Sequence, residues 1–359
     1  MSGTSIDAVD GALILTDGQS VLDFGPVAER KYSRAERAVL QDATQAARDW
    51  NWRGPPPQAA FDDATHVIVQ THSDAWQSLL EQAGEREIAL VGVHGQTVLH
   101  KSASRDTAGA TLQLIDAPRL RAKIERPIAF DFRSADVLAG GQGAPLAPVY
   151  HQALLRPLGG ANAAVLNLGG VANITAYLAN GEMLAFDTGP ANGPLDEWVE
   201  GHDAGTHDEG GRLAAQGRVH DGLLTQLLAH PWFEAPPPKS LDRFDFSASM
   251  VRGLSLADGA ATLTAFTAQS VAAGLAHLDA TPARLIVCGG GRRNPTMMEM
   301  LRRVLPCQVE SAEAVGWRGD SIEAEAFAFL AARTLRGLPL SWPGTTGVPA
   351  PCSGGRILQ

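Results

Sequence analysis

A single carboxylate stands where a short apolar strand runs into residues that disfavour its continuation. Residues 184–190 read Leu-Ala-Phe-Asp-Thr-Gly-Pro, and Asp187 lies at the change. Gly189 can adopt a positive φ and Pro190 has no N–H for a sheet, so the strand is expected to end here. An acid held at a strand end by a stiff turn is well placed to abstract a proton. The fragment alone leaves an equal alternative, a strand-ending Asp that bonds its own turn.

Strands alternate with helices along both halves of the chain, which predicts an α/β fold. With 359 residues, two domains are expected, and the glycine-rich stretch 140–145 is a plausible boundary. The apolar patterns predict strands over 9–16, 88–93, 128–132, 163–168, 172–178 and 285–287. They predict helices over 35–47, 64–83, 211–228, 260–276 and 321–336.

Charge and cysteine content exclude several classes of function. The formal net charge of −10 and a pI near 5.5 argue against a nucleic-acid partner, which requires clustered Lys and Arg. Cys288, Cys307 and Cys352 are far apart in sequence, so neither a disulfide framework nor a zinc site is expected. No apolar run approaches 18 residues and no signal peptide is evident, so we expect a cytoplasmic protein without a membrane partner.

Three glycine-containing loops follow or join predicted strands. Their residues are 2–10 (Ser-Gly-Thr-Ser-Ile-Asp-Ala-Val-Asp), 167–175 (Asn-Leu-Gly-Gly-Val-Ala-Asn-Ile-Thr) and 289–294 (Gly-Gly-Gly-Arg-Arg-Asn). Small residues let backbone N–H groups approach phosphate oxygens, and bare glycine backbone can lie against a base or ribose. Taken singly, the first loop could be a flexible terminus and the second an ordinary hairpin turn. The third does not have the spacing of a dinucleotide fingerprint.

The order of these loops resembles the actin, Hsp70 and sugar-kinase superfamily, and several further motifs resemble one family in it. That family is the anhydro-N-acetylmuramic acid kinases, and the likeness extends over essentially the whole chain. The matching stretches are 1–10, 94–97 (His-Gly-Gln-Thr), 131–133 (Asp-Phe-Arg), 140–145, 167–174, 186–190, 237–240 (Pro-Pro-Lys-Ser), 261–263, 289–291 with Asn294, and 323–324.

The resemblance implies a two-domain, actin-like (ribonuclease H-like) ATPase fold with a central interdomain cleft. The N-terminal α/β domain would comprise 1–138 plus 338–359, and the C-terminal α/β domain 139–337. The implied enzyme uses ATP and Mg²⁺ to open 1,6-anhydro-N-acetylmuramic acid hydrolytically and phosphorylate O6, giving N-acetylmuramic acid 6-phosphate and ADP in peptidoglycan recycling. A homodimer is a family-level expectation.

The resemblance also assigns site residues. Asp187 would be the general base for the attacking water. The sugar would be contacted by Thr97, Asp131, Arg133 and Glu323. ATP would be bound by Ser2, Gly3, Thr4, Ser5, Ile6, Asp7, Ala8, Val9 and Asp10, by Gly169, Gly170 and Asn173, and by Gly289, Gly290, Gly291 and Asn294. The suspects for Mg²⁺ are Asp7, Asp10 and Asp187, which the sequence does not rank. Purely structural roles are equally open at this point. Arg133 could be a surface residue, Glu323 could interact only with the helix dipole, and His94 could be a structural histidine.

The chain departs from the family pattern in two ways. Ala8 and Ala191 stand where the family usually has glycine, which would cost about 1 kcal/mol if either φ were positive. An apolar strand usually precedes the Met-Ser-Gly-Thr-Ser stretch, so we expect the true start to lie upstream of Met1. The alternatives are a kinase of another 1,6-anhydro sugar such as levoglucosan, a weakly active relic, and, least favoured, an Hsp70-like binding module.

Overall fold

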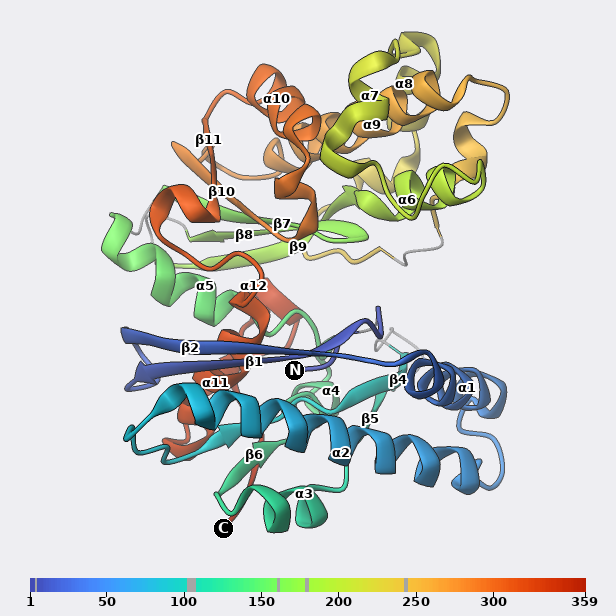
Figure 1. Cartoon of the computed structure of the whole chain (residues 1–359). Helices are drawn as coiled ribbons and strands as arrows, with labels where there is room; N and C mark the ends of the chain where they lie inside the picture. The colour runs from blue at the N-terminus through green and yellow to red at the C-terminus, as the bar shows by residue number, and fades with distance from the viewer. Residues whose placement is uncertain (4, 102–107, 160–161, 178–180, 242–244) are drawn as a thin grey trace. The chain divides into compact units, whose positions relative to one another are not determined.

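A computed structural model describes residues 1–3, 5–101, 108–159, 162–177, 181–241 and 245–359, which form two compact units (Figure 1). The first unit is Met1–Leu154 with Ser321–Gln359, and the second is Leu155–Asp320. Thr4, a predicted phosphate-loop residue, lies outside the described residues. The division predicted at 138 and 338 remains a prediction about domains. Helix α11 (Ile322–Leu335) belongs to the first unit, where Arg333 donates to the carbonyl of Gly18.

The first unit is built around the long antiparallel hairpin of β1 (Ala8–Thr16) and β2 (Val21–Lys31), against which α2 packs (Figure 1). A three-stranded sheet has the order β14-β6-β3, and β4 and β5 form a separate hairpin. Besides β1, β2 and α11, the elements of the first unit have the following bounds: α1 (Arg34–Trp50), α2 (Gln58–Ala83), β3 (Val91–Gly92), β4 (Gln96–Lys101), β5 (Ala110–Leu114), α3 (Ala117–Ile124), β6 (Ile128–Phe130), α4 (Ser134–Leu138), α5 (Pro148–Leu155, which ends at the first residue of the second unit), β12 (Pro339–Ser341), α12 (Pro343–Thr346), β13 (Cys352–Ser353) and β14 (Arg356–Leu358).

The second unit has one five-stranded sheet of order β11-β10-β7-β8-β9. Strand β10 is parallel to β7 and β11, whereas β7, β8 and β9 are antiparallel. The elements are β7 (Ala163–Leu168), β8 (Val171–Tyr177), β9 (Met183–Pro190), α6 (Asn192–Glu200), α7 (Arg212–Gln216), α8 (Asp221–Leu228), α9 (Leu256–Leu275), β10 (Arg284–Cys288), α10 (Pro295–Val304) and β11 (Gln308–Ser311), with 3₁₀ turns at Arg156–Leu158, Glu209–Gly211, Pro231–Glu234, Ala248–Val251, Gly290–Arg293 and Ala312–Val315.

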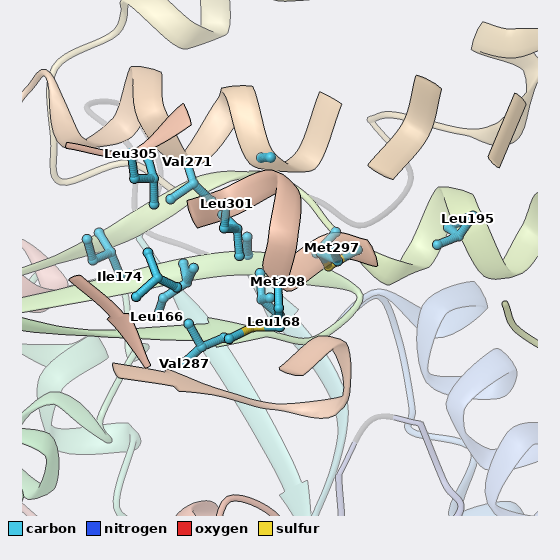
Figure 2. Packing of buried hydrophobic residues seen from close by; sticks show 14 of the residues in the cluster. Leu166, Leu168, Ile174, Leu195, Val271, Val287, Met297, Met298, Leu301 and Leu305 are labelled. Carbon is cyan, nitrogen blue, oxygen red and sulfur yellow. The ribbon is translucent and has the colours of Figure 1, made fainter. Parts of the chain in front are cut away.

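The core of the second unit lies between this sheet and the helices α9 and α10 (Figure 2). Leu166 and Ile174 from the sheet, with Leu301 from α10, are completely buried. Helix α10 begins here because Asn294 accepts a hydrogen bond from the N–H of Met297 and Pro295 occupies the first turn. This packing fixes the strand ends from which the predicted loops leave.

The α/β class predicted from the sequence is confirmed, and three element predictions differ from the structure. The strand expected over 88–93 is reduced to β3 (Val91–Gly92). The single helix expected over 211–228 is two helices, because the backbone at Gly217 is extended, with a φ of −90° and a ψ of 169°. Only glycine fits there, since a Cβ would lie 1.9 Å from the carbonyl oxygen of Ala257. Strand β9 does not end near Asp187 but continues to Pro190. Pro190 is tolerated because β9 is the edge strand of the sheet, where a missing N–H costs no ladder bond.

An apolar cavity of about 290 Å³ lies inside the first unit, along β1 and residues 87–93. Beside it, Met1 and Asp10 exchange two backbone hydrogen bonds, of 2.7 and 2.9 Å. No helix among the described residues is long and apolar enough to cross a bilayer.

Candidate active site

Asp187 lies at a β-bulge in the edge strand β9. In the neighbouring strand β8, Asn173 pairs with Asp187 and Ala172 pairs with Gly189. Thr188 has no partner residue in β8 and is the extra residue of the bulge. Gly189 has a φ of 153°, and a Cβ at this position would lie 2.5 Å from the hydroxyl oxygen of Ser270 in α9. The expected special backbone at Gly189 is therefore present, as an irregularity within the strand rather than a turn after it.

Burial raises the pKa of Asp187 to about 6, and the backbone N–H of Leu241 opposes this rise. That N–H donates to Oδ2 of Asp187 at 2.7 Å. The N–H of Asp187 in turn donates to the carbonyl of Lys239 at 2.9 Å. The carboxylate thus bonds a separate segment of chain rather than its own turn, which answers the alternative left open by the sequence. A carboxyl group with a pKa near 6 is ionised at neutral pH and basic enough to accept a proton.

The second and third predicted loops meet in the second unit. Gly289, with a φ of 74°, has no room for a side chain, because a Cβ would lie 2.4 Å from Oδ1 of Asn167 and 2.7 Å from the carbonyl oxygen of Leu168. Gly169 and Gly170 accept hydrogen bonds through their carbonyls from the first residues of α6. Nothing lies within 4 Å of a Cβ built on Gly170, so its backbone is open to a ligand.

A cavity of about 440 Å³ opens beside the third loop. Gly290, Gly291 and Asn294 line it, together with residues 207–210 and the first half of α6. Asn294 also caps α10 through its side-chain oxygen. The loop predicted to hold adenosine therefore borders a concave space, whereas Asp187, Gly169, Gly170 and Asn173 are not part of its lining.

The described part of the first loop is pinned to the first unit by side chains that were given no role in the sequence prediction. The hydroxyl of Ser2 donates to Gln96 at 2.5 Å and lies 2.8 Å from the hydroxyl of Tyr32. The amide of Gln96, which is fully buried, donates to the carbonyl of Gly3. The loop is therefore held by polar bonds to a buried glutamine and also by apolar packing, because Ile6 and Val9 belong to the hydrophobic core of this unit.

The two acids of that loop have different surroundings. The carboxylate of Asp7 accepts from the Ser5 hydroxyl at 2.7 Å and from the N–H of Ala8 at 2.9 Å. Burial raises the pKa of Asp10 to about 6, although the N-terminal ammonium group opposes the rise. Ala8 has no positive φ and Ala191 has a φ of −129°, so neither alanine carries the cost expected of a left-handed conformation.

Arg133 follows β6 and is held by two neutral acceptors. Its Nε donates to Nε2 of His94 at 2.9 Å, and its Nη1 donates to the carbonyl of Gly143 at 2.8 Å. Nδ1 of His94 lies 2.8 Å from the carbonyl of Gly95, which fixes the tautomer with the proton on Nδ1. Burial lowers the pKa of Arg133 to about 10. Burial, then the charge of Arg133, hold the pKa of His94 well below its usual value, so the imidazole stays neutral.

The other predicted sugar contacts also lie in the first unit. Asp131 has a left-handed backbone, with a φ of 57°, and its carboxylate accepts from the Ser134 hydroxyl. Glu323 lies in the first turn of α11, where the surrounding protein raises its pKa and the Arg133 charge opposes the rise. Thr97 lies in β4 and accepts from the amide of Gln113 at 3.2 Å. Arg133 and Glu323 are thus electrostatically coupled, whereas Thr97 bonds elsewhere.

Sequence reasoning gave no role to Gln96 and Lys239 and left His94 as a structural residue. All three lie in motifs that carried the family resemblance, residues 94–97 and 237–240, and that membership was the available signal.

Among the described residues, no cluster of three or more His, Cys, Asp or Glu side chains is arranged to hold a metal ion. Mg²⁺ bound mainly by phosphates and water would need only one or two carboxylates.

Comparisons with known proteins cover the whole chain. A family model described as anhydro-N-acetylmuramic acid kinase matches residues 1–359. A curated protein of that name from Caulobacter vibrioides is 54% identical over 100% of this chain and 97% of that protein. Another, from Phenylobacterium zucineum, is 51% identical over 100% of this chain and 98% of that protein. A third, from Rhizobium rhizogenes, is 50% identical with the same coverage.

Proposed function

The chain belongs to the anhydro-N-acetylmuramic acid kinase family and is a phosphotransferase, and on that premise we propose that Asp187 is the base of its reaction. The observation that carries this role is the pairing of a raised pKa, about 6, with a carboxylate fixed at a bulge by the N–H of Leu241. The base is thereby oriented and ionised at neutral pH without a neighbouring histidine.

The substrate is 1,6-anhydro-N-acetylmuramic acid, and the balanced reaction consumes one water and one ATP. Asp187 takes a proton from the water as its oxygen bonds to C1 of the sugar. The bond between C1 and the bridging oxygen breaks, and that oxygen, still on C6, receives the γ-phosphoryl group. The products are N-acetylmuramic acid 6-phosphate and ADP. The relatives do not favour another anhydro sugar as substrate.

In the first unit, Arg133 is the residue we assign to an anionic or hydroxyl group of the sugar. It is bound by two neutral acceptors, His94 and the carbonyl of Gly143. A desolvated guanidinium held in this way gains more from a charge-assisted hydrogen bond than one already paired. Glu323, Asp131 and Thr97 supply acceptors and a hydroxyl for the sugar, and those roles rest on the resemblance.

For ATP, the open backbone at Gly170 and the cavity beside Gly290, Gly291 and Asn294 support phosphate and adenosine binding respectively. In the first loop, Ser2, Gly3, Ser5, Ile6, Ala8 and Val9 are assigned to phosphate. Mg²⁺ would neutralise phosphate charge when bound, and Asp10 and Asp7 are the acids of that loop that fit it. The cytoplasm, the homodimer and the actin-like arrangement of domains stay predictions.

The test is the mass of the sugar product. Purified protein with ATP and Mg²⁺ is given 1,6-anhydro-N-acetylmuramic acid or levoglucosan, and both product mass and ADP are measured. We expect the muramic sugar to gain one water and one phosphoryl group, in step with ADP release, and levoglucosan to turn over far more slowly. A product that gains phosphoryl without water would contradict the hydrolytic step, and faster turnover of levoglucosan would contradict the substrate.

A further inference from the structure

Lys239 is a buried cation that the reaction described above does not use. The residue is 9% exposed, and its ammonium group donates to the carbonyls of Trp232 and Phe233, at 3.2 and 3.0 Å. The ammonium also lies 4.5 Å from the centre of the Trp232 ring. No carboxylate forms an ion pair with Lys239 among the described residues. A lysine is rarely buried without an anionic partner unless its position is used.

The backbone around Lys239 is the segment that holds Asp187. The carbonyl of Lys239 accepts from the N–H of Asp187, and two residues later the N–H of Leu241 donates to the carboxylate. Between them, the carbonyl of Ser240 accepts from the indole N–H of Trp232 at 3.2 Å. The ammonium of Lys239 and the indole of Trp232 therefore fasten residues 239–241 to the 3₁₀ turn Pro231–Glu234.

We infer that Lys239 is a positioning residue for Asp187. Its ammonium group holds residues 239–241 against the Pro231–Glu234 turn, and this keeps the Leu241 N–H hydrogen-bonded to the carboxylate of Asp187. The consequence is chemical as well as geometric. A hydrogen bond to the ionised carboxylate favours the charged form. Without the contacts of the Lys239 ammonium, Leu241 would move away from Asp187. The carboxylate would then be desolvated without its hydrogen-bond donor, and the pKa of Asp187 would rise further.

His277 is a titratable neighbour of both Lys239 and this stretch of β9. His277, which follows α9, stands edge-on to the ring of Phe186, the residue before Asp187, at a centroid distance of 6.4 Å. Its Nε2 lies 2.8 Å from the carbonyl of Phe233 and 3.3 Å from the Lys239 ammonium. Burial raises the pKa of Asp187 and the Leu241 N–H opposes the rise, with no charged side chain among the causes. Because Lys239→Met and Lys239→Gln remove the same positive charge, a larger rise in the Asp187 pKa for methionine than for glutamine reports the position of Leu241 rather than the lost charge.

The experiment compares Lys239→Met, Lys239→Gln and Lys239→Arg with the wild-type full chain. The pKa of Asp187 is measured directly, by carboxyl NMR of protein labelled at aspartate and assigned with Asp187→Asn. The matched control is Arg284→Met, which removes a cation paired with Glu310 in the same unit but remote from Asp187. We expect Lys239→Met to raise the Asp187 pKa by roughly one unit, the worth of one hydrogen bond to a charged group. Lys239→Gln should give a smaller rise, and Lys239→Arg and Arg284→Met none.

An Asp187 pKa that is the same in wild type and in Lys239→Met would overturn the inference. If Lys239→Met does not fold, as judged by near-UV circular dichroism, Lys239→Gln decides the matter by the same criterion. The catalytic consequence rests on the proposed function. In the dependence of kcat on pH, the acidic limb should shift to higher pH together with the NMR pKa of Asp187. Loss of stability alone would lower the yield of folded enzyme and leave the pH of that limb unchanged. If the NMR pKa moves and the limb does not, the base assignment is wrong and the positioning role stands.

Discussion

Replacing Asp187 with asparagine should stabilise the folded protein at neutral pH, although it removes the proposed base. Burial raises the folded pKa from 3.8 to about 6, so ionising this carboxyl is harder in the folded than in the unfolded chain. The contribution of the protonated Asp187 carboxyl to the free energy of unfolding is fully present below about pH 4. It is lost as the pH rises through about 6. A shift of about two units corresponds to on the order of 3 kcal/mol above that pH. Asparagine cannot ionise, and its oxygen can still accept from Leu241.

The assay is thermal unfolding of wild type and Asp187→Asn between pH 4 and 8. For a unit of this size, ~3 kcal/mol corresponds to a gain in Tm of roughly 6–12 °C. We expect that gain at pH 8 and nearly equal Tm values at pH 4. Asp258→Asn is a control of opposite sign, because the N–H of Arg218 lowers the pKa of Asp258, so that variant should lose stability at neutral pH and recover as pH falls. A difference for Asp187→Asn that is constant with pH, or a variant less stable at pH 8, would refute the reasoning.

Three further predictions concern activity and ligand binding. The kcat profile of wild type should fall tenfold per pH unit below about 6, where Asp187 becomes protonated; a limb near 4 would contradict this. His94→Phe removes the acceptor of Arg133 and should raise KM for the sugar by about tenfold or more with a smaller change in kcat; a loss confined to kcat would argue against positioning. Gly289→Ala should raise KM for ATP and destabilise by about 1–3 kcal/mol, because its Cβ would meet Asn167 and backbone; an unchanged KM and Tm would show that space exists.

The local signals that predicted structure correctly are those that depend on few neighbours. Strand β7 has the predicted bounds because Ala163–Leu168 is a continuous apolar run that is buried in the middle of the sheet. The glycine-containing loop predicted after the strand 285–287 is present directly after β10, and Gly289 in it has a φ of 74°. The acids and glycines of the candidate site were therefore accessible from sequence.

The misses depend on partners that are distant in sequence. Gly217, where the expected helix is interrupted, packs against the carbonyl of Ala257, forty residues later. Pro190 continues β9 because that strand lies at the sheet edge. Arg133 and His94 lie in two separate motifs, and their contact needs the fold to bring β6 and the end of β3 together. Lys239 acts through backbone bonds to Asp187, which no local pattern encodes.

The most direct measurement is kcat for ADP release with 1,6-anhydro-N-acetylmuramic acid in wild type, Asp187→Asn and Glu197→Gln. Glu197 is the matched control, because its carboxylate also accepts a backbone N–H at 2.7 Å, from Ala248, in the same unit. The account predicts a loss of about 10²–10⁴-fold for Asp187→Asn, the contribution of a positioned general base, and none for Glu197→Gln. Equal kcat in folded Asp187→Asn and wild type would contradict it.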